Sequence, residues 1–243
     1  MIFEASRFVF KAPAAISRAR RVLIKPCAGY PVAYPVTTSR EMLSVIIKGI
    51  RKVSDADILL LDGTPGGGPI YPIYQALGYD FPRVLALDVK DCTWVEVDNP
   101  LAKPLAVPTF LVPNVILSSD FLITTAPLKV VNGVGSLSIM NLLSLLPGSK
   151  YGDGSGGGWE YLHPLDIDKV IADLYFTLPF DLGIIEARQK FITGPEMAKG
   201  EIEECGKVFI GEPYQVDREA SAALGLKTSH LDLIEEARVG LEI

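Results

Sequence analysis

The sequence predicts an α/β protein with a mostly parallel central sheet, helices on both faces and an irregular proline-rich segment. Short and almost wholly apolar runs recur along the chain, as in strands that are buried on both faces of a parallel sheet. Segments with apolar residues at helical spacing alternate with these runs, which is the order of strands joined by crossover helices. Hydrophobic residues make up 49% of the 243 residues and charged residues 21%, enough to bury a sizeable core.

The first third of the chain predicts a strand–helix–strand unit. Residues 22–24 are an apolar run that ends at Lys25. A capping box at residues 38–41 predicts the start of a helix, with the Thr38 hydroxyl as the cap. Residues 58–61 form the next buried strand, so the two strands are expected to pair in parallel through a right-handed crossover.

The other elements follow in order along the chain. A glycine-rich loop precedes a short helix at 70–77, further strands are expected at 84–87, 93–97, 121–123, 182–185 and 208–210, and further helices at 137–146, 166–175, 215–224 and 231–239. Four prolines within residues 100–118 predict irregular extended structure or edge strands. We expect one domain over residues 1–243, or two lobes of one domain, with a mobile glycine-rich loop or lid at 148–158.

Charge and cysteine content exclude several classes of protein. The 23 Lys and Arg residues against 29 Asp and Glu residues give a net charge of −6, which argues against a nucleic-acid partner. The cysteines are far apart and form no C-x-x-C pair, so no disulfide framework, zinc site or iron–sulfur motif is expected. The sequence has no run of 18 apolar residues and begins unlike a signal peptide, so we expect a cytoplasmic protein without a membrane partner.

Polar residues follow the predicted strands one after another. Lys25, Asp62, Lys129 and Glu186 stand at or just beyond strand ends, where open parallel sheets bind their ligands. The two lysines could neutralise an anion, whereas Asp62 and Glu186 could act as acid or base or hold a divalent metal. Loops are polar in any case, so a shared cleft and a set of solvated strand ends are both open at this point.

The glycine-rich loop after the second strand is the sharpest local motif. Glycines between a strand and a helix let backbone N–H groups approach an anion, so Gly66, Gly67 and Gly68 could cradle a phosphate or carboxylate. A tight turn is the plain alternative, because the loop matches neither the Walker A motif nor the dinucleotide fingerprint. His163 could act as acid or base and Cys27 as a nucleophile, although a surface histidine and a buried thiol are the commoner cases.

A series of motifs resembles the domain-of-unknown-function family 362 over about residues 20–226. They are Val22-Leu23-Ile24-Lys25-Pro26, Thr37-Thr38, Leu61-Asp62-Gly63-Thr64-Pro65-Gly66-Gly67, Ser119-Asp120-Phe121-Leu122-Ile123, Pro127-Leu128-Lys129, Asn141-Leu142-Leu143, Gly194-Pro195 and Gly211-Glu212-Pro213-Tyr214-Gln215-Val216-Asp217. The resemblance implies an α/β fold and retains Lys25, Asp62, the loop glycines, Lys129, Asn141 and Asp217 as candidate ligand positions. Some relatives carry a ferredoxin-like module, which implies redox or metal-associated metabolism, but this chain has none.

The chain departs from the family pattern at three places. Val130 and Val131 follow Lys129 where the family usually has Thr and His, Met140 stands where a Lys is common, and Glu186 stands where an Asp is usual. A His and a Lys are therefore missing from the presumed cleft.

The predicted function is the binding of a small anionic metabolite, a phosphate or a carboxylate, at the carboxyl edge of the sheet, with or without catalysis. One alternative is a redox or metal-linked protein that works with a separate iron–sulfur partner. The other is a non-catalytic subunit of an oligomer, because a mean hydropathy of +0.29 fits a buried interface, most simply that of a homodimer. A divalent metal at Asp62 and Glu186 is the cofactor that the residues would allow.

Overall fold

The computed structural model describes residues 1–153, 158–194, 196 and 199–240. Residues 154–157 of the predicted glycine-rich loop and Pro195 of the family motifs lie outside these ranges. The described start of that loop is a short helix, α4 (Gly148–Tyr151). No helix in the described part of the chain is long and apolar enough to cross a membrane.

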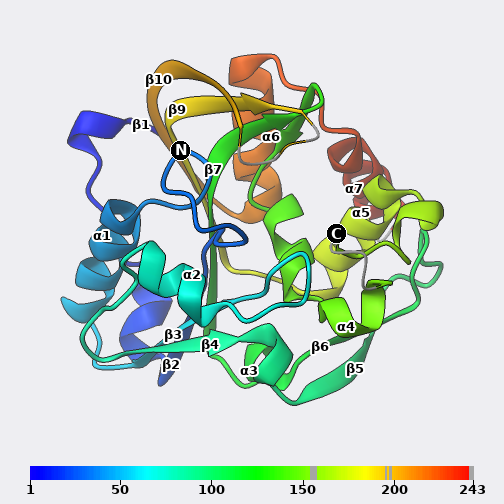
Figure 1. Ribbon diagram of the computed structural model, residues 1–243, viewed down its shortest axis with the longest axis horizontal. Coiled ribbons are helices and arrows are strands. Elements are labelled where there is room, and N and C mark those ends of the chain that lie inside the picture. Colours follow the sequence, from blue (N-terminus) through cyan, green and yellow to red (C-terminus); the bar gives the residue numbers. More distant parts are fainter. Residues whose placement is uncertain (154–157, 195, 197–198, 241–243) are drawn as a thin grey trace.

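An eight-stranded mixed sheet runs through the described residues in the order β1-β10-β9-β7-β2-β3-β4, with β8 paired to β7 (Figure 1). The parallel strands are β2 (Arg21–Lys25), β3 (Asp57–Asp62), β4 (Val84–Asp88), β7 (Phe121–Val131) and β9 (Leu182–Thr193). The antiparallel strands are β1 (Ile2–Glu4), β8 (Val134–Ser136) and β10 (Gly200–Gly211). The predicted α/β class with a mostly parallel sheet is confirmed.

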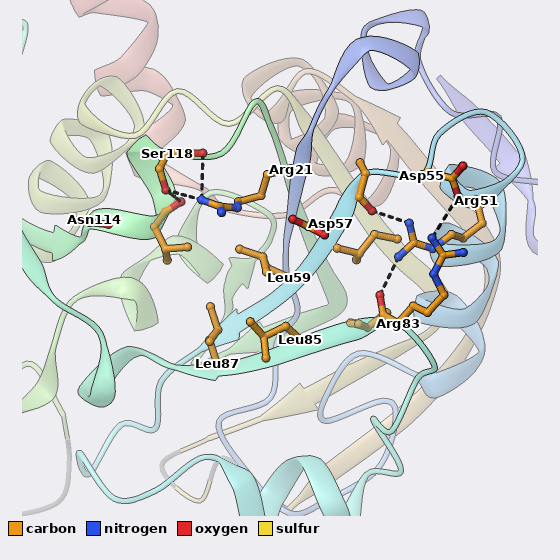
Figure 2. Close-up of a pocket in the computed structure, with 14 residues that line it drawn as sticks. Arg21, Arg51, Asp55, Asp57, Leu59, Arg83, Leu85, Leu87, Asn114 and Ser118 are labelled. Carbon is orange, nitrogen blue, oxygen red and sulfur yellow. Dashed lines mark hydrogen bonds and ion pairs between the residues drawn. The ribbon is translucent and has the colours of Figure 1, made fainter.

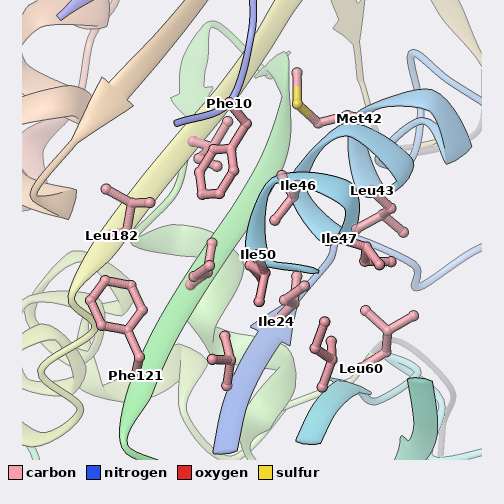
Figure 3. Close-up of a cluster of buried hydrophobic side chains, with 14 of the residues drawn as sticks. Phe10, Ile24, Met42, Leu43, Ile46, Ile47, Ile50, Leu60, Phe121 and Leu182 are labelled. Atoms are coloured by element: carbon pink, nitrogen blue, oxygen red, sulfur yellow. The ribbon is translucent and has the colours of Figure 1, made fainter. Parts of the chain in front are cut away.

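Helices cover both faces of this sheet, as Figure 1 shows. On one face, α1 (Arg40–Arg51) buries Leu43, Ile46 and Ile50 against strand residues that include Ile24 and Leu60 (Figure 3). The remaining helices are α2 (Tyr71–Ala76), α3 (Asn114–Leu117), α5 (Ile167–Thr177), α6 (Pro213–Leu224) and α7 (Ser229–Gly240). The other face packs against α5 and α6, a 3-10 helix η4 (Met140–Leu145), and the small sheet of β5 (Trp94–Asp98) and β6 (Thr109–Pro113).

The start of α1 differs by one residue from the predicted capping box. Ser39 caps the helix, because its hydroxyl accepts a hydrogen bond from the Met42 N–H. The Thr38 hydroxyl instead donates to the Thr125 carbonyl and accepts from the Cys27 N–H. Contacts across the sheet therefore outweigh the local capping preference of Thr38.

Several elements differ in length or type from the prediction. Strands β7, β9 and β10 extend well beyond their apolar cores, because strand pairing continues through Val131 of β7 and through the partly exposed and exposed parts of β9 and β10. The predicted helix at 137–146 is the shorter η4, and its Asn141 and Ser144 side chains bond to the residues Lys25 and Asp62 at the strand ends, while Ser144 also bonds to the Asn141 carbonyl within η4. The proline-rich segment holds the expected edge strand β6 and also the unpredicted helix α3.

Asp173 of α5 anchors the proline-rich segment. Its carboxylate is completely buried. It accepts hydrogen bonds from Asn99 Nδ2 (2.7 Å) and from the N–H groups of Leu105 (3.0 Å), Ala106 (2.7 Å) and Val107 (2.8 Å). One carboxylate thus satisfies backbone donors that have no strand partner.

Asp217 of α6 fixes the turn that leads into η4. Its Oδ1 accepts from the Ser138 N–H (3.0 Å) and hydroxyl (2.5 Å), and its Oδ2 accepts from the Ile139 N–H (2.9 Å). Desolvation raises the pKa of this carboxyl to about 6, although the hydrogen bonds and the nearby His230 act in the opposite direction. This predicted ligand residue holds the segment that carries Asn141.

Asp173→Ala should lower the free energy of unfolding by at least about 3 kcal/mol, because it leaves buried donors without an acceptor. Urea denaturation of the variant measures this loss. Asp98→Ala is the matched control, since that exposed carboxylate on the same segment accepts, among the described side chains, only from the Thr109 hydroxyl. Its change should stay within about 0.5 kcal/mol. Equal losses in the two variants would contradict the anchoring role.

Because its pKa is raised in the folded protein, Asp217 should make the protein less stable as the pH rises. The folded protein binds this proton more tightly than the unfolded chain, since the folded pKa of about 6 lies above the usual 3.8. The stabilisation is therefore complete below about pH 4 and is lost as the pH rises through about 6, by on the order of 3 kcal/mol. Denaturation at intervals across this window should show a steeper loss for the wild type than for Asp217→Asn. Parallel curves would contradict the assignment.

Candidate functional site

The polar residues predicted at the strand ends form two groups at the carboxyl edge of the sheet. Lys25, Asp62 and Asn141 make up the first group. The second lies on the face that α1 covers and holds Lys129 and Glu186, which have separate partners: Lys129 contacts Cys27, and Glu186 contacts Ser39 and Arg188. The two groups are joined by the loop that follows β2, because Cys27 of this loop contacts Lys129.

The first group is a buried ion pair whose hydrogen bonds are complete. Lys25 is fully buried, as is Asp62. The Lys25 Nζ donates to Asp62 Oδ1 (2.7 Å), to the Pro26 carbonyl (2.8 Å) and to Asn141 Oδ1 (3.0 Å). An ammonium has three N–H donors, so each has a partner within the protein.

Asp62 and Asn141 extend this ion pair into a network. Asp62 also accepts from the N–H groups of Gly63 (2.9 Å) and Ala28 (2.7 Å) and from the Ser144 hydroxyl (2.6 Å). The Asn141 amide donates to Thr124 Oγ1 (3.1 Å) on β7. The network therefore joins the ends of β2, β3 and β7 to η4 and fixes the backbone just beyond Lys25.

The second group contains a buried cation that lacks a counter-charge. Lys25 and Lys129 are the buried lysines of the described residues, and Lys129 is 6% exposed. Its Nζ donates to the Cys27 Sγ at 3.2 Å. None of the described carboxylates forms an ion pair with it within 4.0 Å, in contrast to Lys25. An isolated buried charge is costly, so this position favours a negative partner.

A buried hydroxyl without a partner among the described residues lies on the same face of β7 as Lys129. Side chains alternate along a strand, so Thr125 and Lys129 share the face of β7 that carries Ile123 toward α1. The Thr125 hydroxyl is buried and has no hydrogen-bond partner among the described residues. Cys27 is half-buried, and burial together with the charge of Cys27 raises the pKa of the neighbouring Tyr30. The thiol that contacts Lys129 thus belongs to a partly exposed residue.

Glu186 connects β9 to the start of α1. Its carboxylate accepts from the Ser39 hydroxyl (2.7 Å) and N–H (3.0 Å), and it pairs with the Arg188 Nη2 at 2.5 Å. Burial raises the pKa of Glu186, while Ser39 and Arg188 lower it. The Arg188 guanidinium lies 4.6 Å from the centre of the Tyr34 ring, and its buried Nε has no partner in the described part of the chain. Arginine here offers a second donor for an anion.

The glycine loop forms a separate cavity of about 320 Å³. Gly66 and Gly67 line it together with Gly148 and Ser149, but so do the carboxylates Asp153 and Glu160, which disfavour an anion. Gly68 is not among the lining residues and accepts a hydrogen bond from the Thr64 hydroxyl at its carbonyl. The predicted cradle thus lies beside two negative charges.

The other predicted residues lie outside both groups. His163 lies in an exposed 3-10 turn, η5 (His163–Leu165), and Asp217 fixes Ser138 and Ile139 as described above. Asp62 and Glu186 have separate partners. Over the described ranges, no three His, Cys, Asp or Glu side chains gather where they could hold a metal ion. Metal binding by these carboxylates stays a prediction.

A larger cavity of about 710 Å³ lies at the opposite, amino-terminal edge of the sheet (Figure 2). Arg21, Arg51 and Arg83 line it around leucines of β3 and β4. These arginines already bond within the protein: Arg21 to the Ser118 hydroxyl (2.9 Å), and Arg51 to the Arg83 carbonyl (2.7 Å). Ligands of open α/β sheets bind at the carboxyl ends, so the candidate site is the edge that holds Lys129.

The sequence places Thr125 and Arg188, like Lys129 and Glu186, among the polar residues that follow the apolar strand cores, but it assigns the first two no role. Because the length of β7 was not predicted, the sequence did not indicate that Thr125 and Lys129 lie on the same face of one strand. Arg188 follows Glu186 by two residues, but the sequence does not reveal that it folds back onto this carboxylate.

Comparison with known proteins agrees with this fold. The lactate racemase apoprotein from Thermoanaerobacterium thermosaccharolyticum is similar in structure, with a TM-score of 0.55 and 13% sequence identity. The likeness covers 89% of this chain and 53% of that protein, so this chain spans about half its length. At this identity the similarity is one of fold. No curated protein matches the chain.

The family relationship is clearer than this structural similarity. The family described as Domain of unknown function (DUF362) matches residues 22–222, which is most of the chain and includes β2 through α6 up to Ala222. The motifs around Lys25, Asp62, Lys129 and Asn141 all lie inside this range. The chain therefore belongs to the domain-of-unknown-function family 362.

Proposed function

We propose that the protein binds a small anion, a carboxylate or a phosphate, at the carboxyl edge of its sheet with Lys129 as the cationic anchor. The observation that carries this proposal is the buried Lys129 ammonium, which has a thiol neighbour but no carboxylate partner among the described residues. A bound anion would offset the cost of burying this charge.

Neighbouring groups give this anchor more than one donor. The Thr125 hydroxyl and the Arg188 Nε are both buried and lack partners among the described residues, so an anion on this face could accept from them. Glu186 holds Arg188 and the N-terminus of α1 in place. Lys25 enters the proposal as a positioning residue, because its three donors are used by Asp62, Pro26 and Asn141.

The choice of ligand class rests on size and charge. One lysine, one hydroxyl and one guanidinium N–H suit a single carboxylate or phosphate group rather than a polyanion. The structurally similar lactate racemase is named for a small hydroxy carboxylate, which makes lactate a reasonable first probe beside inorganic phosphate. Binding alone is proposed, with no reaction assigned. Contributions from Gly66, Gly67 and Gly68 stay predictions.

The alternative functions stay predictions as well. An iron–sulfur partner would need a docking surface, which none of the contacts described above identifies. An oligomeric role would use exposed apolar side chains at the sheet edges, such as Ile2 on β1 and Leu85 on β4. These side chains are scattered, and single exposed apolar residues are common on monomers.

Titration of the ¹⁵N-labelled protein with sodium lactate and with inorganic phosphate should shift the amide resonances of the loop after β2, including Cys27 and Ala28. Lys129→Met should weaken the affinity about ten- to a hundredfold, because it removes a charge-assisted hydrogen bond. Lys190→Met is the matched control: this lysine is half-buried on the neighbouring β9 and already pairs with Glu203 at 2.9 Å. Its affinity should equal that of the wild type.

Two results would overturn the proposal. One is that neither anion shifts the loop resonances of the wild type at millimolar concentration. The other is that Lys129→Met, shown to be folded by its amide spectrum, binds as well as Lys190→Met does.

A further inference from the structure

We propose that Cys27 is a nucleophilic thiol that reacts with small carboxylates carrying an electrophilic carbon, with Lys129 directing the carboxylate. The preference for anionic reagents rests on the proposed anion site, whereas the reactivity of Cys27 itself is a separate claim. Neither the family description nor the structural similarity to lactate racemase assigns a role to this cysteine.

The contact between Lys129 and Cys27 is the basis of this inference. Reactive cysteines lie in electropositive, partly exposed surroundings, and inert ones lie in apolar cores. The Lys129 Nζ is 3.2 Å from the Cys27 Sγ, and the thiol is half-buried rather than enclosed. Lys129 is 6% exposed, and no carboxylate of the described residues forms an ion pair with its Nζ within 4.0 Å. A cation is therefore fixed beside the thiol of a partly exposed residue.

The backbone around Cys27 is held on both sides. The Cys27 N–H donates to the Thr38 hydroxyl at 2.9 Å, and the next N–H, that of Ala28, donates to the buried Asp62 carboxylate at 2.7 Å. The thiol therefore has a defined place relative to Lys129, which favours reaction with a bound ligand. The unpartnered Thr125 hydroxyl on the Lys129 face of β7 offers a further donor to the ligand carboxylate.

The two other cysteines provide internal controls. Cys92 and Cys205 are also half-buried, so exposure alone does not separate them from Cys27. Burial and then the charges of Asp88 and Asp91 raise the pKa of Cys92 to about 11. Burial raises the pKa of Cys205 as well, although Lys207 and Lys190 act in the opposite direction. Both thiols should react slowly near neutral pH, because the thiolate is the nucleophile.

The proposed step is a simple substitution or addition. With iodoacetate, a sulfur electron pair forms the new carbon–sulfur bond, the carbon–iodine bond breaks, iodide leaves, and the thiol proton goes to solvent. With an α,β-unsaturated carboxylate, the same pair attacks the β-carbon and the α-carbon takes up a proton. Neither step needs an oxidant or a metal.

Alkylation with iodoacetate and with uncharged iodoacetamide tests both parts of the inference. Mass spectrometry of peptides after short exposures gives a rate for each cysteine and each reagent. Cys27 should react about tenfold or more faster than Cys92 and Cys205. Its rate ratio of iodoacetate to iodoacetamide should exceed that of the other two cysteines. In Lys129→Met the ratio should fall to their level, whereas Lys190→Met should leave it unchanged.

Equal rates at the three cysteines, or a Cys27 ratio that Lys129→Met leaves unchanged, would overturn the inference. Phosphate titration of Cys27→Ser separates this failure from failure of the anion site. If Cys27→Ser still binds phosphate through Lys129 while Cys27 of the wild type fails to react selectively, the thiol role is wrong and the anion site stands. If the wild type binds neither phosphate nor lactate, the anion site itself is wrong.

Discussion

The constraint on which this carboxyl edge depends is the fully buried ion pair between Lys25 and Asp62. Removing two charges from water is costly, and their attraction offsets the cost only when the remaining donors and acceptors are also satisfied. This requirement is met here. The three Lys25 donors have acceptors, and Asp62 accepts from Lys25, Gly63, Ala28 and Ser144. Because these partners come from β2, β3, η4 and the loop after β2, the pair determines where each of these segments lies at the carboxyl edge.

The proposed site follows from the same arrangement. Since Asp62 neutralises Lys25 and fixes Ala28, the preceding Cys27 is placed beside Lys129, whose charge has no such partner among the described residues. Other buried carboxylates also accept hydrogen bonds from nearby segments and hold those segments in place. Asp173 holds the proline-rich segment, Asp217 holds the turn before η4, and Glu186 holds the N-terminus of α1. Each carboxylate accepts from donors of an irregular segment and belongs to a regular element, whereas Lys129 has no carboxylate partner among the described residues and is left for a ligand.

Much of the fold could be predicted because buried strands are continuous apolar runs, but the candidate site could be predicted only in part. Lys25, Asp62 and Lys129 were recognisable as polar residues at strand ends. Their different roles were not, because the sequence does not reveal which lysine meets a carboxylate. Asn141 and Ser144 reach the strand ends from a segment whose pattern indicates an ordinary helix. Thr38 does not cap the helix as predicted, because its hydroxyl donates to the carbonyl of Thr125, which lies 87 residues away along the chain. Long-range pairing of this kind leaves no local signal.

A double-mutant cycle on Lys25→Met and Asp62→Ala, followed by urea denaturation, tests the central claim most directly. Each single variant leaves one buried charge without its partner and should lose about 3–5 kcal/mol of unfolding free energy. The double variant should lose clearly less than the sum of the two, with a coupling energy of at least about 1 kcal/mol, because it buries neither charge. Additive losses, with a coupling energy within about 0.5 kcal/mol of zero, would contradict the view that this ion pair organises the carboxyl edge.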